Sequence, residues 1–469
     1  MTSTANTPLR PGAPADRQPP LVPGLPVLGN ALDLRMNPLE NLTDMYHRHG
    51  PAFRIKVPGR TIWVMAGLEA NEFLAREGER YLGSEEVFGP FGAELGSDAL
   101  MVALDGVPHR HQRKVQRRGY SRKVILAELP LVDSCTRTVA RSWVDGQTFP
   151  LLAQMQEVVV EQLGIMIAGR PAHGLLDDLR ILLNTNLRVN VLKMSPRVLL
   201  RRPRYRRAYA RVMAFGDEVL EWHRRNPPSA SDAERAPNLV DDLLAAVDET
   251  GSAYSRQMLL TSIAGSYFAG LDTVASSVSF LLAAILRTPG LQRTIAAEAD
   301  VAFASGELTP ASLQGMSTLH AATLESLRRY PVAPFTPRTV NEDFDFAGYR
   351  YPAGAEVFVA QAVTHLLDEY FADPLVFNPR RAAHDGVRKT PMTYAPFTLG
   401  AHTCLGAGLA ELQMMAIVAV LLHEVELELA KPTKPLKVHA TPLPHPGRRL
   451  RLRVVRHRLP EAASADNRS

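Results

Sequence analysis

The sequence contains very little cysteine, with only Cys135 and Cys404 among its 469 residues. Two cysteines cannot build a disulfide framework, nor the multi-cysteine ligand set of a structural zinc or iron–sulfur site. The first twenty residues lack the continuous apolar segment of a secretory signal peptide. We therefore expect the chain to fold in a reducing compartment, and we predict a cytoplasmic location.

A large excess of one charge is also absent, because 53 Lys and Arg residues face 48 Asp and Glu residues, a net charge of +5. Basic residues nevertheless gather in three clusters, at 106–127, 197–207 and 448–458. Nucleic-acid-binding proteins carry such clusters too, but no recognition motif accompanies these. We expect no nucleic-acid partner.

Long hydrophobic runs are nearly absent. The segment Met258–Leu286 holds one charge, Asp272, and is long enough to cross a bilayer. Its many serines and threonines make it too polar for a comfortable span, so we interpret it as a long buried helix. We find no comparable run elsewhere, and the sequence therefore predicts no transmembrane segment.

The ends of the chain differ in composition from its centre. Residues 1–20 are polar and rich in Thr, Ala and Pro, and residues 459–469 are polar as well. We predict a disordered N-terminal tail over 1–20, one large folded domain over 21–458, and a frayed C-terminal tail over 459–469.

Most of the folded part has helical periodicity. Apolar residues recur at helical spacing over Leu151–Ile167 and Ala208–His223. Alternating patterns predict strands at 52–57 and 61–65, joined in a hairpin through Pro58-Gly59, and at 449–454. The fold class predicted is mainly α with small β-sheets.

Cys404 lies in the segment Phe397-Thr-Leu-Gly-Ala-His-Thr-Cys-Leu-Gly406. A thiolate needs backbone N–H donors and positive surroundings, and a helix predicted over Leu405–Leu422 would direct its N-terminal dipole at this position. Flanking glycines let the backbone approach a flat, bulky group. The alternative is a buried structural cysteine at a junction of loop and helix.

The spacing F-x-x-G-x-H-x-C-x-G resembles the haem-binding loop of the cytochrome P450 family. The resemblance extends from about Pro20 to Arg458 and implies the P450 fold of the soluble bacterial type, with haem b as cofactor. It implies that Cys404 is the axial iron ligand. Phe397, Gly400 and Gly406 are the loop residues expected beside the cofactor. Thr398 departs from the family, which usually has Gly or Ser there.

The segment Ala269-Gly-Leu-Asp-Thr273 resembles the oxygen-activating stretch of the family's central helix. The resemblance implies catalytic roles for Gly270, Asp272 and Thr273, with Ala269 next to the haem. Glycine within a helix is locally unfavourable, so we expect Gly270 to leave room for a ligand or to permit a helix bulge. A buried Asp272 must find a partner. The alternative for Thr273 is a hydrogen bond to the Ala269 carbonyl.

Four further residues are expected to bind the cofactor. His109 and Arg113 are four residues apart, so they share one helix face, and cations there suit the two haem propionates. The resemblance adds Arg338 and His402 to this group.

A weaker match is E-x-x-R at Glu325–Arg328, since Glu77–Arg80 and Glu221–Arg224 match as well. Only the match at 325 is followed by Arg338 and then by a segment that includes Arg381. By resemblance, Glu325, Arg328 and Arg381 form a structural triad.

The resemblance implies a monooxygenase that inserts one oxygen atom from O2 into a lipophilic small molecule, by hydroxylation or epoxidation. Electrons would come from NAD(P)H through a reductase and a separate ferredoxin or flavodoxin, docked on the basic cluster 106–127. The cluster 197–207 adjoins Val198-Leu-Leu200, which is compatible with weak contact to a membrane surface. Pocket-lining residues are expected at 87–96 (especially Phe88 and Phe91), 332–335 and 440–443.

Two other classes of function remain open. One is a haem-thiolate peroxygenase, isomerase or carrier. The other is a non-enzymatic basic helical binding protein whose cysteine loop is fortuitous.

Overall fold

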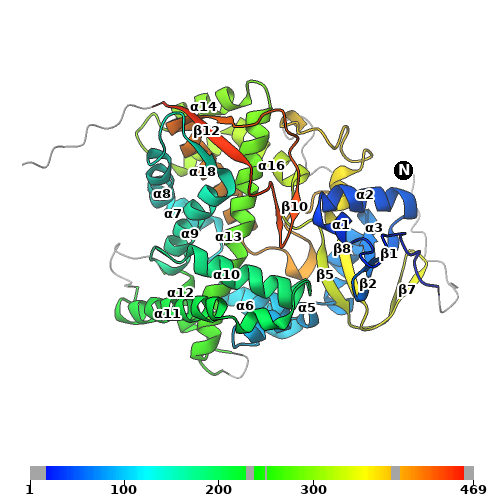
Figure 1. Cartoon of the computed structure of the whole chain (residues 1–469). Helices are drawn as coiled ribbons and strands as arrows, with labels where there is room; N and C mark the ends of the chain where they lie inside the picture. Colours follow the sequence, from blue (N-terminus) through cyan, green and yellow to red (C-terminus); the bar gives the residue numbers. More distant parts are fainter. Residues whose placement is uncertain (1–16, 229–236, 249–250, 382–390, 459–469) are drawn as a thin grey trace, which may run out of the picture.

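The computed structural model describes residues 17–228, 237–248, 251–381 and 391–458. A large helical part surrounds the long helix α13 (Arg256–Arg287), and a smaller part with the main sheet lies beside it (Figure 1). The outer parts of both predicted tails, 1–16 and 459–469, lie outside the described residues. Residues 17–20 were expected in the N-terminal tail, but they contact the fold: the Arg54 amide donates to the Pro20 carbonyl (2.8 Å), and the Arg350 amide to the Arg17 carbonyl (3.0 Å).

Helices make up most of the chain, as the sequence predicts. Besides α13 they are α1 (Ala31–Arg35), α2 (Pro38–His49), α3 (Leu68–Arg76), α4 (Gly78–Tyr81), α5 (Glu85–Glu94), α6 (Gly106–Gln116), α7 (Arg122–Ala127), α8 (Leu129–Arg141), α9 (Leu151–Ala168), α10 (Leu176–Asn186), α11 (Pro203–Arg225), α12 (Leu239–Ala245), α14 (Leu291–Ala302), α15 (Pro310–Gly315), α16 (Ser317–Arg329) and α18 (Ala407–Glu424). Short 3-10 or π turns are η1 (Met101–Ala103), η2 (Leu187–Val191), η3 (Arg197–Arg201), η4 (Gln361–Leu366) and η5 (Gly400–His402). The helices predicted at 151–167, 208–223 and 405–422 are confirmed, with ends that differ by a few residues.

The strands are short and form four small sheets. The largest has the order β1 (Ala52–Val57), β2 (Arg60–Ala66), β8 (Glu356–Ala360), β5 (Thr336–Val340) and β3 (Leu82–Gly83). The others pair β4 (Thr148–Pro150), β12 (Arg451–His457) and β9 (Val425–Leu429); β6 (Phe344–Phe346) and β7 (Tyr349–Tyr351); and β10 (His439–Ala440) and β11 (Pro444–His445). The predicted hairpin is confirmed, and Gly59 has the positive φ of +79° that its turn requires. The C-terminal strand begins two residues later than predicted.

The core is built around α13, which packs along α9 and is buried along almost all of its length. Three segments are long and apolar enough to cross a membrane: Leu151–Ala168, Arg256–Arg287 and Gly400–Glu424. The expectation of a single such run was therefore wrong. In each, 72–78% of the most apolar window is buried within the protein, as expected for the segment around α13. Burial against each other satisfies these apolar surfaces without lipid.

The segment between α1 and α2 meets the segment before β10. The Asn37 amide donates to the Val438 carbonyl (2.8 Å), and the Val438 amide donates to the Asn37 side-chain oxygen (2.9 Å). Met36 also forms an isolated bridge with His439. The turn between β10 and β11 is thereby held against the N-terminal segment.

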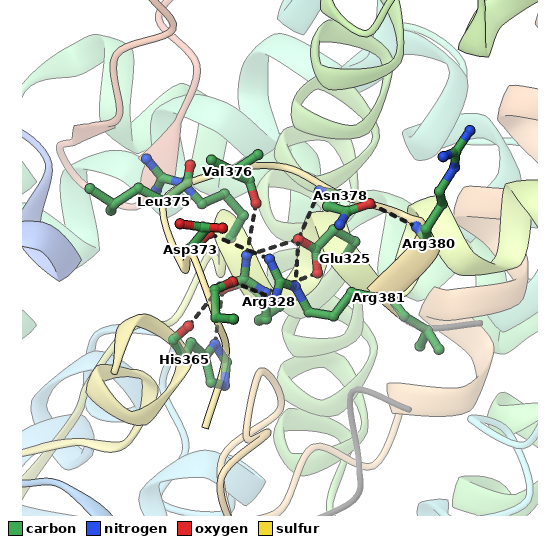
Figure 2. Close-up of polar contacts among 12 residues, drawn as sticks. Glu325, Arg328, His365, Asp373, Leu375, Val376, Asn378, Arg380 and Arg381 are labelled. Atoms are coloured by element: carbon green, nitrogen blue, oxygen red, sulfur yellow. Dashed lines mark hydrogen bonds and ion pairs between the residues drawn. The ribbon is translucent and has the colours of Figure 1, made fainter. Parts of the chain in front are cut away.

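The predicted triad forms a buried ionic cluster (Figure 2). Glu325 and Arg328 are fully buried and make a bidentate pair at 2.8 and 2.9 Å, while Arg381 Nε lies 3.4 Å from Glu325 Oε1. Arg328 also donates to the His365 carbonyl (2.6 Å), and the Asn378 amide donates to Glu325 Oε1 (3.0 Å). The cluster therefore joins α16 to η4 and to the segment 372–381.

We predict that Glu325→Gln lowers the free energy of unfolding by about 3–5 kcal/mol, because Arg328 keeps its charge in the core without a counterion. The matched control is Glu342→Gln, which removes a carboxylate from an exposed pair with Arg80. Urea denaturation should show an unchanged midpoint for the control. Equal midpoints for both variants would contradict a role of the buried pair in stability.

Candidate active site

A large internal cavity lies between α13 and the segment that contains Cys404. Its volume is about 760 Å³. Its lining includes Cys404 with its neighbours Thr398, His402, Thr403, Leu405 and Gly406, and also Ala269, Gly270 and Thr273 of α13. Cys404 and Thr273, which are 131 positions apart in the sequence, thus border the same cavity.

The cysteine loop is held by its own backbone. The Cys404 amide donates to the Phe397 carbonyl (2.9 Å), and the Thr403 amide donates to the Gly400 carbonyl (3.1 Å). Gly400 has a φ of +73°, and a Cβ there would lie 2.5 Å from the Leu74 carbonyl oxygen, so only glycine fits. At Gly406 the nearest atom to a Cβ is 3.8 Å away, and the protein itself does not require glycine. Phe397 does not line the cavity but packs against the main core.

The surroundings of Cys404 shift the pKa of its thiol in opposite directions. Its side chain faces the open cavity, yet the enclosing protein desolvates it, and this burial raises the pKa of the thiol. A hydrogen bond from the Gly406 amide and the charge of Arg113 lower the pKa, but by less. The groups predicted to stabilise a thiolate are thus present, but their effect on the pKa is smaller than that of burial. A cation bound at the sulfur would favour the thiolate.

His109 and His402 meet at one edge of the cavity. Their rings stack with centroids 3.9 Å apart and planes 21° apart. His402 Nε2 also bonds Asp105 Oδ1 at 3.1 Å. Burial, followed by the charges of His402 and Arg113, lowers the pKa of His109 to about 3, so its imidazole is neutral at pH 7.

Two guanidinium groups also reach this cavity, that of the buried Arg338 and that of the half-buried Arg113. Arg338 is 4% exposed and donates only to a backbone carbonyl, that of Pro337 (2.8 Å); burial lowers its pKa to about 10. Arg113 donates to the Thr403 carbonyl (2.7 Å), and burial lowers its pKa as well. Within the described part of the chain, neither forms an ion pair with a carboxylate. Two uncompensated cations beside a free sulfur could hold a cofactor that carries both carboxylates and a soft metal.

The two polar residues of the α13 wall point to different places. Thr273 lines the cavity, and its hydroxyl donates to the Ala269 carbonyl (2.6 Å), the local bond considered above as the alternative. Asp272 is 8% exposed and does not line the cavity; its Oδ1 accepts from Gln156 of α9 at 2.6 Å. Burial raises the pKa of Asp272. The expected acid–alcohol pair is therefore divided between the cavity and the α9–α13 interface.

Gly270 serves close helix packing rather than a bulge. Helix α13 is continuous α-helix from end to end, so of the two alternatives expected for Gly270, room for a ligand or a helix bulge, the bulge is wrong. A Cβ on Gly270 would lie 2.8 Å from Leu163 of α9. Leu163 and Gly270 both line the cavity, and the glycine lets the leucine reach it.

The segments 332–335 and 440–443 line the cavity over their whole length, as expected. Of the segment 87–96, only Phe88 does. Phe91 does not: it packs edge-to-face on Phe268 with ring centroids 5.9 Å apart. Sequence reasoning missed the lining residues Leu163, Met166 and Ile167 of α9, because the last six residues of this helix, 163–168, are all apolar or glycine and give no signal of which side is turned inward. It also missed Tyr120, whose hydroxyl donates to Ser266 Oγ (2.5 Å).

Thr398, the departure from the family pattern, has a strained backbone. Its φ is +57°, a left-handed conformation that is rare for a β-branched residue. Its hydroxyl lies 3.1 Å from that of Thr336, whose hydroxyl donates to Gln361 Oε1 (3.1 Å). Gln361 in turn donates to the Ala333 carbonyl (2.6 Å). The cysteine loop is thus connected to the lining segment 332–337.

We predict that Thr398→Val lowers the free energy of unfolding by about 1–2 kcal/mol, because it removes the hydroxyl and keeps the strain. Thr398→Gly should cost less than Thr398→Val, because relief of the left-handed backbone offsets the lost bond. Denaturation midpoints of the two variants test this order. The reverse order would show that strain at Thr398 is unimportant.

Comparisons with known proteins agree with this geometry. The sequence model described as Cytochrome P450 matches residues 19–450. A putative cytochrome P450 139 of Mycobacterium tuberculosis is 28% identical over 404 residues, covering 83% of this chain and 91% of that protein. A sterol 14alpha-demethylase of Mycolicibacterium vanbaalenii is 24% identical, covering 86% and 90%.

Solved structures agree in fold. The retinoic acid-bound cyanobacterial CYP120A1 superimposes with a TM-score of 0.79 at 23% identity, covering 94% of this chain and 99% of that one. The haem domain of cytochrome P450DA gives 0.81 at 19% identity, covering 95% and 99%. The family match spans more than nine-tenths of the chain, and the predicted mainly α fold is confirmed. The chain belongs to the cytochrome P450 family.

Proposed function

We propose that this haem-thiolate monooxygenase inserts one atom of O2 into a lipophilic small molecule, by hydroxylation or epoxidation. This proposal depends on one observation: a single, largely apolar cavity is lined by both Cys404 and Thr273. We further propose that residues 21–458 act as a single haem domain and that the enzyme works in the cytoplasm.

The residues fit haem b. Cys404 would hold the iron through its sulfur, and Arg113 and Arg338, which lack carboxylate partners in the described chain, would pair with the two propionates. His109 and His402 flank these cations and would add hydrogen bonds. Ala269, Gly270 and Gly406 offer small surfaces to a flat group. When bound, haem supplies the binding and activation of dioxygen that no side chain can perform.

Thr273 would handle protons on the cavity side. Its hydroxyl hydrogen is engaged with the Ala269 carbonyl, so the oxygen can accept a hydrogen bond from a group in the cavity. Rotation of the hydroxyl turns the same group into a donor. Burial raises the pKa of Asp272, so this carboxyl group would take up a proton more readily than an exposed one, on the α9 side of the helix.

The remaining lining would position the substrate and exclude water. Phe88, Leu163, Val332 and Phe335 present apolar surfaces to the cavity. Such pockets favour lipophilic ligands. The names of two relatives, a sterol demethylase and a protein with bound retinoic acid, refer to lipophilic molecules and support this substrate class.

Electrons would arrive from NAD(P)H through a reductase and an acidic ferredoxin or flavodoxin. Of the cations in 106–127, Arg110, Arg118 and Arg122 pair with Glu79, Asp242 and Glu411. Lys114, Arg117 and Lys123 are exposed, and no ion pair is found for them within the described residues. We propose these three as the docking charges.

We predict that Cys404→Ser abolishes the thiolate-type absorption band of the reduced, CO-bound protein, because an alcohol oxygen is a much weaker donor to iron. The matched control is Cys135→Ser, which alters the half-buried cysteine of α8 and should keep the band. A Cys404→Ser protein with an intact band would refute the ligand assignment. Purified wild-type protein that takes up no haem would favour a non-enzymatic binding protein.

We predict that Thr273→Ala reduces product formed per NAD(P)H oxidised by about tenfold or more, because a positioned proton donor typically contributes at least that much. Thr273→Ser keeps the hydroxyl and should retain most of the coupling. The measurement is product yield against NAD(P)H consumption with a surrogate ferredoxin and reductase. Unchanged coupling in Thr273→Ala would show that the proton-relay assignment of Thr273 is wrong.

A further inference from the structure

Helix α9 carries two buried glutamines whose amide groups are bonded to different degrees. Gln162 uses both ends of its amide: Nε2 donates to Thr136 Oγ1 (3.0 Å), and Oε1 accepts from Gln413 (2.9 Å). Gln156 is 5% exposed, and its Nε2 donates to Asp272 Oδ1 (2.6 Å). Its Oε1 is buried too, but has no hydrogen-bond partner in the described part of the chain. A buried acceptor without a partner costs free energy, so helix packing alone does not explain Gln156.

The two ends of the Gln156 amide offer two different partners to the carboxyl group of Asp272. An ionised carboxylate only accepts hydrogen bonds, whereas a protonated carboxyl group also donates one. The observed orientation directs an N–H at Asp272, which suits the ionised form. A half-turn of the amide would direct Oε1 at Asp272 instead, and this terminal torsion has a broad, roughly two-fold profile. The same side chain can thus partner either protonation state.

Asp272 depends on this amide because no cation contacts it. None of the described residues forms an ion pair with Asp272, and the charged groups that act on it, Arg180 of α10 and Arg448 before β12, do so from a distance. Burial raises the pKa of Asp272, the hydrogen bond from Gln156 lowers it, and each of the two arginines lowers it by less. The balance between the two protonation states therefore depends chiefly on burial and on one amide group.

We propose that Gln156 is a positioning residue for the proton relay of α13: its amide holds the ionised Asp272 toward α9, and it turns to accept a hydrogen bond when that carboxyl group takes up a proton from water. A cation in this place would favour the ionised form alone, whereas an uncharged amide serves both forms. The carboxyl group therefore stays able to gain and lose a proton inside the core. The proposal rests on the proposed function for the use of that proton.

The experiment follows the carboxyl group of Asp272 by infrared difference spectroscopy of the full-length, haem-loaded protein during a pH titration. The protonated-carboxyl band that disappears in Asp272→Asn identifies the group. Gln156→Met removes both ends of the amide at nearly constant volume, and the ionised form loses the stronger hydrogen bond. We expect the midpoint of the titration to move to higher pH by about one unit or more.

A second variant tests the same contact without removing its polarity. Gln156→Glu places another carboxyl group beside Asp272, so the pair should share one proton and titrate in two separated steps. If Gln156→Met does not fold, the titration of Gln156→Glu decides the question alone.

The matched control is Gln154→Met, two residues earlier on α9. It removes an amide that bonds Trp143 and Glu157, and it should leave the midpoint of Asp272 unchanged. The second readout is the pH dependence of product formed per NAD(P)H oxidised. In Gln156→Met the loss of coupling at high pH should move upward together with the infrared midpoint, and in Gln154→Met it should stay in place. A merely structural role of Gln156 would move neither profile.

Several outcomes would overturn the proposal. These are an unchanged midpoint in Gln156→Met, a single unsplit titration in Gln156→Glu, or an equal shift in Gln154→Met. A midpoint that moves while coupling keeps its pH profile also contradicts it, because Gln156 would then act on a carboxyl group that delivers no proton. Failure of the proposed function is seen separately: the wild type would lack the thiolate-type absorption band. An intact band with an unmoved midpoint contradicts the role of Gln156 alone.

Discussion

The burial of α13 is the constraint on which the rest of the structure depends. A helix of 32 residues with almost no charge must be covered on all sides, and α9, α11, α16 and α18 all pack on it. At Gly270 it packs tightly on α9, where Leu163 occupies the space of a missing side chain. Ala269, Gly270, Thr273 and Val274 line the cavity, so the helices that cover α13 also shape the space available to ligands.

Buried arginines in this protein are of two kinds. Arg328 is neutralised by Glu325 and belongs to a cluster that fastens α16 to the segments after it. Arg338 is almost equally buried but donates only to a carbonyl, and Arg113 does the same. An uncompensated buried charge destabilises the protein that carries it and stabilises a complex with an anion. Arg328 therefore stabilises the fold. Arg338 and Arg113 would instead stabilise a complex with an anionic cofactor.

The fold class, the cysteine loop and its accompanying cations could be predicted from the sequence, because they depend on patterns of residues that are close together in the chain. The predictions that were wrong or absent have physical causes. The sequence does not reveal that Gln156 of α9 holds Asp272 away from the cavity, because that contact joins two distant helices. The last six residues of α9, 163–168, are all apolar or glycine, so they give no signal of which side lines a pocket. Phe91 looked equivalent to Phe88 because both are apolar residues of one helix, and only packing against Phe268 separates them.

The hydrogen bonds between Asn37 and Val438 have a consequence for folding. They join positions about 400 residues apart, and the turn 440–443 that they anchor completes a cavity whose first wall is at Leu28. A chain emerging from the ribosome therefore has no complete pocket until nearly all of it has been synthesised. Contacts of such long sequence separation form late and slowly. Capture of the cofactor must accordingly be a closing event of folding rather than a nucleus for it.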